Sequence, residues 1–218
     1  MKTTHVKQWA IQVAEAVEIL NVAGVVHRFI RPENIILTPH RNGSINIKLT
    51  SFDFATRYWD SNTRSLIPLH AKLPIDVPPH LLNHLPPESF MEGHDGSMVD
   101  VWSIGSMICI LLTDENPFVV PEMTVNTDSN TGSEINGGDV PDHLQRWKWC
   151  DERRMLPDEI RFLLDDIFKE ANARINAWEV AKDKRLWCKN AKELNQMRSP
   201  DYYRIDLSKA NTLLLLIY

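Results

Sequence analysis

The stretch from residue 98 to residue 113 limits the folds available to this chain more than any other part of it. Asp100 is its only charged residue, and apolar side chains fall on nearly every side of a helix drawn through it. A surface helix is apolar along one stripe only, so this helix is predicted to lie buried among other elements. It is shorter than the roughly 20 apolar residues that cross a bilayer, and no transmembrane segment is expected.

Other helices are predicted around that one. Near the start of the chain, apolar residues recur at helical spacing on one face, in a helix expected to end near Gly24. These residues are Val6, Trp9, Ala10, Val13, Val17 and Leu20. Further helices are expected at residues 143–150, 158–169 and 178–187. Residues 45–55 instead indicate a strand that runs into a turn, so a mainly α-helical fold with one short β-hairpin is predicted.

The segment after the first helix reads His27-Arg28-Phe29-Ile30-Arg31-Pro32-Glu33-Asn34. The catalytic loop of protein kinases reads H-R-D-L-x-x-x-N, in which the Asp is the base toward the substrate hydroxyl and the Asn binds magnesium. The segment resembles this loop at His27, Arg28 and Asn34. Phe29 stands in the place of the base, and a phenyl ring cannot accept a proton.

Five further segments resemble kinase motifs in the family's order. They are the strand and D-F-G turn at residues 45–55, the A-P-E element Leu85-Pro86-Pro87-Glu88, the start of the central helix at residues 100–105, the loop after it at residues 115–118, and the late arginine element at residues 173–177. The chain therefore resembles the Ser/Thr protein kinases over roughly residues 3 to 190. The resemblance implies the C-terminal lobe of the kinase fold.

The resemblance begins at the helix just ahead of the catalytic loop. The Gly-rich phosphate loop, the strand Lys, the Glu that pairs with it and the adenine-gripping hinge all come earlier in a kinase. The only Gly-dense stretch here, residues 132–138, is not followed by a V-A-I-K strand. An N-lobe is therefore expected to be absent, and the chain is either a free C-lobe or a piece of a longer protein. No cofactor is expected, with Mg-ATP only if a longer form supplies an N-lobe.

The magnesium-binding turn fits the family in two registers. In the better one, Ser51-Phe52-Asp53 takes the D-F-G places, and Ser51 is then a poor ligand for a cation that prefers carboxylates. In the other, Asp53-Phe54-Ala55 is the turn. Asp53 and Asn34 are the two candidate metal ligands.

The remaining loop residues are expected to have structural roles. Phe29 is predicted to pack against apolar neighbours, and Phe52 to pack beside His27. Arg31 stands where Ser/Thr kinases carry Lys. It is expected to be solvated or structural, because the planar guanidinium of Arg replaces the compact ammonium of Lys. In a degraded site, Asn34 is expected only to hydrogen-bond the loop backbone.

The kinase arginine that Arg28 matches contacts a phosphorylated residue of the activation segment. The candidates here are Thr56, Tyr58, Ser61, Thr63 and Ser65. An ordinary polar loop is the favoured interpretation, because such loops are common and variable.

Three residues are expected to hold the lobe together. The resemblance implies an ion pair between the A-P-E glutamate, Glu88, and the late arginine, Arg174, which requires no nucleotide. Asp100 is expected to hydrogen-bond the catalytic-loop backbone and also to cap its own helix. The architecture is therefore predicted to be kept while the chemistry is lost.

One domain is expected at residues 1–190, with a flexible polar insertion at residues 119–142 and a tail at residues 191–218. The net charge of -5 argues against a nucleic-acid partner. Cys109, Cys150 and Cys188 have no metal-ligand spacing, so a reduced, intracellular and most simply cytoplasmic setting is expected.

The predicted function is that of a pseudokinase C-lobe that acts through protein–protein interaction, with an active kinase as one candidate partner. The alternative is a Ser/Thr protein kinase, transferring phosphate from ATP to protein hydroxyls, of which this chain is a fragment or a divergent member. A decayed gene product without a selected role is the third possibility. The degenerate loop, with His27, Arg28, Phe29, Arg31 and Asn34, gives no residue that we name as catalytic.

Overall fold

The computed structural model describes residues 2–39, 41, 44–69, 83–118, 147 and 150–188. The chain divides into two units, Met1–Trp187 and Cys188–Tyr218, and the fold described below is that of the first. The predicted helix at residues 143–150 falls outside the described residues except at Trp147 and Cys150. The predicted insertion at residues 119–142 and the tail at residues 191–218 lie wholly outside them.

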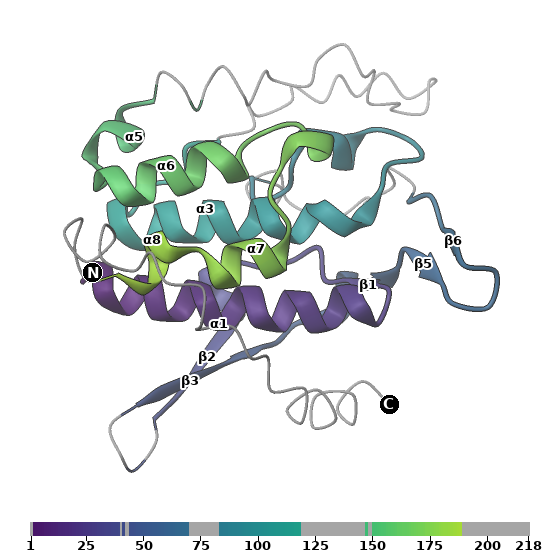
Figure 1. The fold of residues 1–218 in the computed structure, drawn as a ribbon, viewed down its shortest axis with the longest axis horizontal. Coiled ribbons are helices and arrows are strands. Elements are labelled where there is room, and N and C mark those ends of the chain that lie inside the picture. The colour runs from purple at the N-terminus through teal and green to yellow at the C-terminus, as the bar shows by residue number, and fades with distance from the viewer. Residues whose placement is uncertain are drawn as a thin grey trace, which may run out of the picture. The chain divides into compact units, whose positions relative to one another are not determined.

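Most of the described elements are helices (Figure 1). The α-helices are α1 (Thr3–Val22), α3 (Val99–Thr113), α5 (Asp151–Met155), α6 (Asp158–Ile167), α7 (Ala177–Lys182) and α8 (Lys184–Trp187). Short 3-10 turns lie at η1 (Pro32–Asn34), η2 (Phe52–Phe54), η3 (Pro87–Phe90), η4 (Gly96–Met98) and η5 (Ala171–Ala173). The mainly helical prediction is confirmed, and so are the helix at the start of the chain and the helix at residues 158–169, which ends at Ile167.

Helix α3 forms the centre of the fold, with α1 on one side and α6 on the other (Figure 1). Trp102, Ile104, Met107 and Ile108 of α3 have no solvent exposure. A methyl group added at Gly105 would lie only 2.7 Å from Ile167 Cγ2, so α3 and α6 approach more closely there than a larger residue permits. The buried helix predicted at residues 98–113 is therefore confirmed.

The same helix is the one described segment that could cross a membrane by length and composition. That segment is Gly96–Thr113, and 67% of it is buried inside the structure. A core helix passes the same test, so its apolar character is accounted for by the packing described above.

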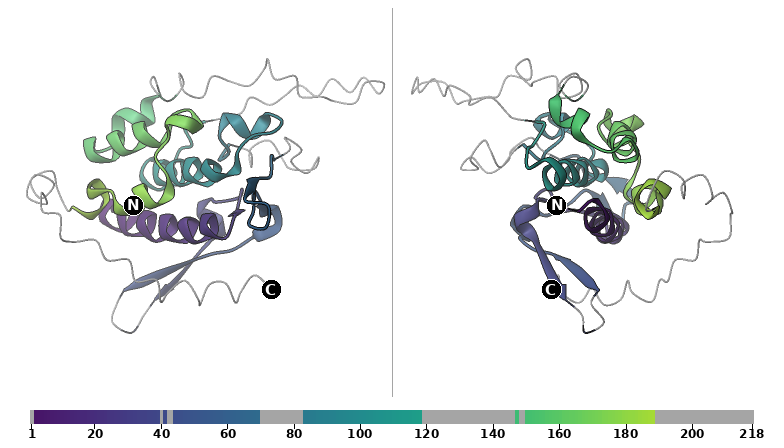
Figure 2. Two further views of the ribbon diagram at one scale, coloured as in Figure 1. Left: turned by 45° about the vertical axis from the view of Figure 1, so that its right-hand side comes forward. Right: turned by 90° about the vertical axis from the view of Figure 1, so that its left-hand side faces the viewer.

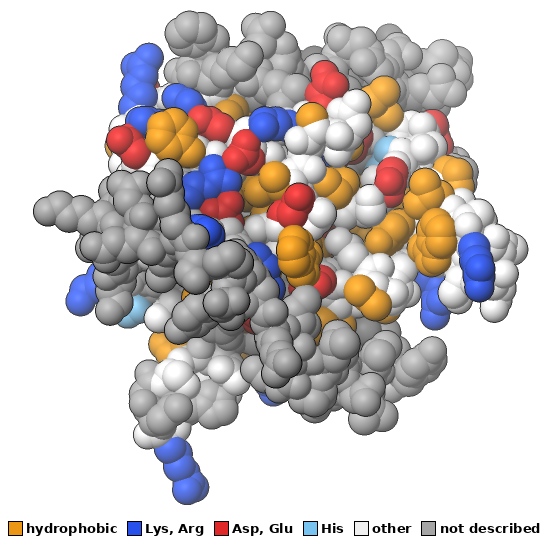
Figure 3. Space-filling model, viewed as in Figure 1, with side chains coloured by type: hydrophobic (Ala, Val, Ile, Leu, Met, Phe, Trp, Pro, Cys, Tyr) orange, Lys and Arg blue, Asp and Glu red, His pale blue; other side chains and the backbone are white. Residues whose placement is uncertain are grey.

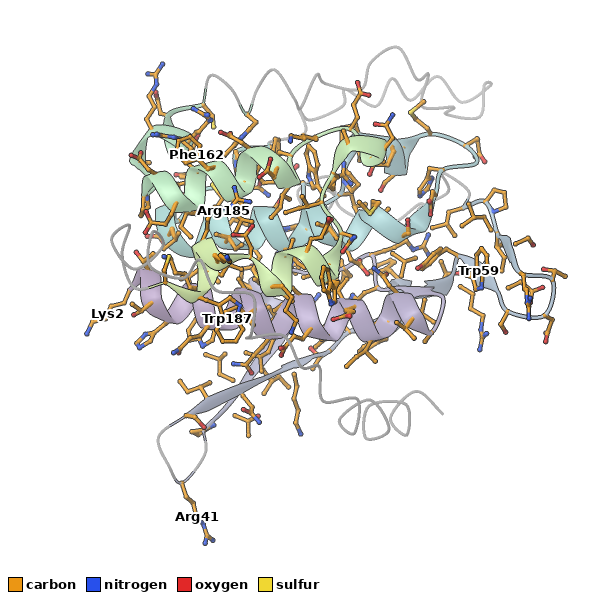
Figure 4. The ribbon with its side chains drawn as sticks, viewed as in Figure 1. Lys2, Arg41, Trp59, Phe162, Arg185 and Trp187 are labelled. Atoms are coloured by element: carbon orange, nitrogen blue, oxygen red, sulfur yellow. The ribbon has the colours of Figure 1, made fainter. Side chains whose placement is uncertain are left out.

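The single helix predicted at residues 178–187 is wrong, because the structure divides it into α7 and α8. Asp183 breaks the helix: its backbone is extended, and its carboxylate accepts the backbone N–H of Arg185 at 2.8 Å, as a helix cap does. Arg185 also reaches α6, where its Nη2 lies 2.8 Å from Asp166 Oδ2 (Figure 4). These contacts hold α8 against α6.

Three two-stranded antiparallel sheets are described. β1 (Val25–Val26) pairs with β4 (Thr56–Arg57), and β5 (Trp59–Asp60) pairs with β6 (Ser65–Leu66). The longest is the hairpin of β2 (Ile35–Pro39) and β3 (Ile45–Leu49), in which Ile35 faces Leu49 and Pro39 faces Ile45. This is the short hairpin predicted beside the loop. It projects away from α1 on the side opposite α3 and α6 (Figures 1 and 2).

Candidate functional site in the loop after β1

The loop after β1 is fixed to the central helix through its backbone. Asp100 of α3 is fully buried, and its carboxylate accepts the backbone N–H of His27 at 2.7 Å and that of Arg28 at 2.8 Å. The predicted contact with the loop backbone is thus present. The predicted cap is wrong: α3 begins at Val99, and both carboxylate oxygens are used by the loop instead.

His27 is held as a neutral imidazole. Its Nδ1 accepts the backbone N–H of Phe29 at 3.2 Å, and its Nε2 lies 3.1 Å from the carbonyl oxygen of Thr50, which can only accept. The proton therefore resides on Nε2. Burial lowers the pKa of His27, and burial likewise raises the pKa of the Asp100 carboxyl, although the two backbone N–H groups that it accepts act in the opposite direction.

The side chain at the predicted base position is packed between two neighbours. The Phe29 ring meets the Phe54 ring edge-on, with 4.6 Å between their centroids. On the same ring, the guanidinium carbon of Arg31 lies 5.7 Å from the centroid, a cation–π contact. Phe29 therefore packs against apolar and cationic groups, and it offers no atom that can take a proton.

Arg31 is also joined to Glu33. Its Nε donates to Glu33 Oε2 at 2.7 Å, and this hydrogen bond lowers the pKa of Glu33 to about 2. The Arg31 side chain is only 14% exposed, so it serves as a part of the loop more than as a solvated charge. The two open interpretations of Arg31, solvated or structural, are resolved toward the structural one.

The two candidate metal ligands are placed differently. Asn34 is buried, and its Nδ2 donates to the carbonyl of Phe29 at 2.9 Å, the contact with the loop backbone expected of a degraded site. Asp53 lies in η2 with an exposed side chain. Within the described part of the chain, no group of three or more His, Cys, Asp and Glu side chains is arranged to hold a metal ion. A metal role for Asn34 and Asp53 stays a prediction.

The turn before β4 brings Phe52 beside His27, with 4.5 Å between the ring centroids. This contact was expected from the register in which Ser51 takes the place of the metal Asp. Ser51 itself has a φ of 62°, in the left-handed region that few non-glycine residues adopt. Its hydroxyl, unlike a carboxylate, offers a cation no negative charge.

Comparison with known proteins decides the family. The model of the protein kinase domain matches residues 1–185. The chain belongs to the protein kinase family. It is 33% identical over 115 residues to the serine/threonine-protein kinase CHK1 of Saccharomyces cerevisiae, covering 51% of this chain and 20% of that protein. It is 28% identical over 159 residues to the CBL-interacting protein kinase 5 of Oryza sativa, an alignment that covers 72% of this chain and 30% of that protein. It is 30% identical over 112 residues to the serine/threonine-protein kinase ULK1 of Homo sapiens, and this alignment covers 49% of this chain and 10% of that protein. These alignments span less than a third of each relative's length.

The kinase fold is secured by the ion pair predicted between Glu88 and Arg174. The Arg174 side chain has no exposure, and its Nη2 lies 3.2 Å from Glu88 Oε2 while Nη1 contacts Oε1. The remaining donors reach the carbonyls of Met98 and Lys169, each at 2.8 Å. The guanidinium also lies over the Trp102 ring, 4.9 Å from its centroid. Arg174 thus ties the A-P-E element to α3.

In this kinase-family chain, the Arg28 side chain joins the loop after β1 to the turn before β4. Its Nε donates to the carbonyl of Phe54 at 2.7 Å. Of the candidate phosphorylation sites, Tyr58 is 7% exposed and its hydroxyl donates to the carbonyl of Asn21 at 3.1 Å, which makes it inaccessible in this fold. Thr63 and Ser65 are exposed and hydrogen-bonded to each other at 2.8 Å.

Sequence reasoning missed two residues around the kinase loop. Thr50 accepts from His27 and donates its hydroxyl to the Asn34 carbonyl at 3.0 Å, so it joins both ends of the loop. His84 is 6% exposed with an unpartnered Nδ1, and burial together with the charge of Arg31 lowers its pKa to about 4. A threonine at the end of a strand was the only local signal for the first, and none pointed to the second.

Proposed function

We propose that this protein is a catalytically inactive member of the protein kinase family that acts by binding a protein partner. One observation carries the proposal: Phe29 occupies the base position, packed against Phe54 and beneath Arg31. The same loop keeps its backbone bonds to Asp100, so the scaffold is intact around a side chain that cannot accept a proton.

The size of the defect supports this proposal. A positioned general base is worth roughly 10²–10⁴ in rate. Most of phosphoryl-transfer catalysis comes from positioning and from charge on the metal and phosphates. Ser51 at the metal position would weaken that second contribution as well, because Mg²⁺ favours carboxylate oxygens. Two losses in one site leave little for phosphate transfer.

The test is phosphate transfer from radiolabelled ATP to a generic protein substrate, with Mg²⁺ and with chelator. We expect no metal-dependent transfer above background from the wild-type chain. Asp53→Ala is the matched control. Phosphate transfer by a contaminating kinase is the same in preparations of the variant and the wild type, whereas an intrinsic activity that uses Asp53 is lost in the variant. Metal-dependent turnover that Asp53→Ala abolishes would sink the proposal.

A second candidate is a Ser/Thr protein kinase of which this chain is a part. The relatives CHK1 and ULK1 favour it, since they are serine/threonine-protein kinases and the alignments span only a fraction of their length. The intact mass of the endogenous protein separates the candidates. A mass well above 25.2 kDa calls for ATP titration of the longer form with and without Mg²⁺, beside its Phe29→Asp and Ser51→Asp variant. Metal-dependent ATP binding would favour this candidate.

The binding role that we propose concerns a protein, with an active kinase as one class of partner, and involves neither nucleic acid nor a bound cofactor. We place it inside the cell, where the thiols of Cys109, Cys150 and Cys188 stay reduced.

A further inference from the structure

The two edges of the β2–β3 hairpin differ in whether their outward backbone groups have hydrogen-bond partners among the described residues. On the β3 edge, the Gln12 side chain of α1 acts as a substitute strand: its Nε2 donates to the Ile45 carbonyl at 3.0 Å, and its Oε1 accepts the Ile47 N–H at 3.0 Å. The N–H and C=O of one residue in a strand point to the same side, and successive residues alternate. The backbone groups of Asn46 and Lys48 therefore point toward β2.

This alternation fixes which groups of β2 point outward. The register pairs Ile36 with Lys48 and Thr38 with Asn46, so Ile35, Leu37 and Pro39 direct their backbone groups away from β3. Among the residues that the structure describes, none accepts from the Leu37 N–H or donates to the Leu37 carbonyl. Within the described part of the chain the β2 edge is therefore open, and it ends at Pro39, which has no N–H to offer.

Apolar side chains accompany this open edge. Ile36 is 53% exposed and Leu37 is 42% exposed, and as neighbours in a strand they lie on opposite faces of the hairpin. An exposed apolar edge strand is a template for pairing with another extended chain. Natural proteins protect such edges, as Gln12 does for β3, and nothing described does so for β2.

The hairpin also carries charge of one sign. Residues 35–49 contain Arg41 and Lys48 and no Asp or Glu, although the whole chain has a net charge of -5. Lys48 is exposed and lies directly across from Ile36. Arg41 extends into solvent at the tip (Figure 4), and the described surface of the hairpin shows no acidic side chain (Figure 3). The local charge suits an acidic ligand.

We propose that the outer edge of β2 is the docking site for a short, extended, acidic segment of a protein partner, which adds to the hairpin as a third strand. This inference rests on the proposed binding function. The Leu37 N–H and C=O supply the main-chain pairing that such strand addition requires. Lys48, on the same face of the hairpin as Ile36, selects an acidic residue of the added segment, and Pro39 limits the length of the added strand.

The test uses the full chain and a fluorescein-labelled peptide of alternating Glu and Val, followed by fluorescence anisotropy. Two matched peptides accompany it: alternating Lys and Val, and the Glu–Val peptide N-methylated on the backbone nitrogens of one edge. N-methylation removes the peptide N–H donors that pair with β2, and we expect it to weaken binding at least about tenfold. We also expect the Lys–Val peptide to bind at least about tenfold more weakly, because its charge has the same sign as that of Lys48, and the Glu–Val peptide to bind more weakly as salt is raised.

Variants of the protein test the same edge from the other side. Leu37→Pro removes the outward N–H while leaving the bonds of Ile36 and Thr38 to β3, since an edge strand tolerates proline there. Lys48→Glu reverses the charge, and Lys2→Glu is its control at an exposed site far along the chain from the hairpin. We expect Leu37→Pro and Lys48→Glu to weaken binding about tenfold, and Lys2→Glu to leave it unchanged. The N-methylated peptide keeps the test valid if Leu37→Pro misfolds.

Four outcomes would overturn the inference. Equal binding of the N-methylated peptide means that no strand is added. Equal binding by Lys48→Glu means that charge does not select the ligand. A concentration-dependent dimer that Leu37→Pro abolishes assigns the edge to a second copy of this chain. Absence of peptide binding and of phosphate transfer overturns the docking edge alone, whereas peptide binding together with metal-dependent transfer overturns the proposed inactivity alone.

Discussion

At the scale of single residues, the site is shaped by which groups can carry a proton. Phe29 cannot, His27 holds its proton on Nε2 against a backbone carbonyl, and Glu33 stays ionised because Arg31 lowers its pKa to about 2. The catalytic-loop region therefore contains titratable groups that are committed to structure. None of these three is available as a base near neutral pH.

The buried side chain of His84 is expected to make the free energy of unfolding depend on pH. Burial and then the charge of Arg31 lower its pKa to about 4, whereas an unfolded chain titrates its histidines near about 6.5. Between these pH values the unfolded chain binds a proton that the folded chain does not, so stability falls as the pH is lowered through this window. We expect His84 to contribute a loss of about 3 kcal/mol in unfolding free energy by pH 4, with His27 adding a loss of the same sign.

Urea unfolding at several pH values checks this expectation in the wild type and in His84→Gln. The variant should lose less stability than the wild type between pH 6.5 and pH 4. Parallel curves for the two proteins would show that His84 titrates normally in the folded state.

At the scale of elements, one amide side chain makes the hydrogen bonds that join α1 to β3. Gln12→Ala leaves the Ile47 N–H and the Ile45 carbonyl without their partner, and a loss of about 1–3 kcal/mol is expected. Gln8→Ala, at an exposed position of the same helix, is the matched control and should stay within about 0.5 kcal/mol of the wild type. Amide exchange at Ile47 should speed up in Gln12→Ala only. Unchanged exchange there would rule out the strand-like role of Gln12.

The helices and the hairpin could be predicted because their signals are local. Helical spacing of apolar residues identified α1, and an apolar stretch identified α3. The role of Gln12 could not be predicted, since a polar residue on an amphipathic helix has no local mark of a partner 35 residues away. The break at Asp183 was missed for a related reason: an Asp two residues before an Arg indicates a cap only once the chain has turned there.

The candidate site was likewise predicted only in part from the sequence. The motif order predicted the Glu88–Arg174 pair and the contact of Asp100 with the loop. Motif order could not show that Asp100 has no oxygen left to cap α3, because this depends on two amides that arrive from a distant part of the chain. It also gave no sign of His84, whose burial and whose electrostatic neighbours Arg31 and Glu33 are known only from the structure.

At the scale of the whole molecule, one buried ion pair joins segments that are far apart in sequence. Glu88→Ala leaves the Arg174 guanidinium, which has no exposure, without its counter-charge, and a loss of about 3–5 kcal/mol is expected. Asp151→Ala breaks the exposed pair with Arg154 and should cost about 1 kcal/mol or less. Thermal and urea unfolding measure both. Similar costs for the two variants would mean that burial adds nothing to the Glu88–Arg174 pair.

Asp100 holds the loop by the backbone amides of His27 and Arg28, and a backbone amide is present whatever side chain the residue carries. The bonds that attach the loop to α3 therefore do not depend on which side chain stands at position 29. In this architecture, an exchange of a base for a ring leaves the loop attached. A kinase fold can thus lose phosphate transfer without losing its scaffold, and the scaffold remains available for another task.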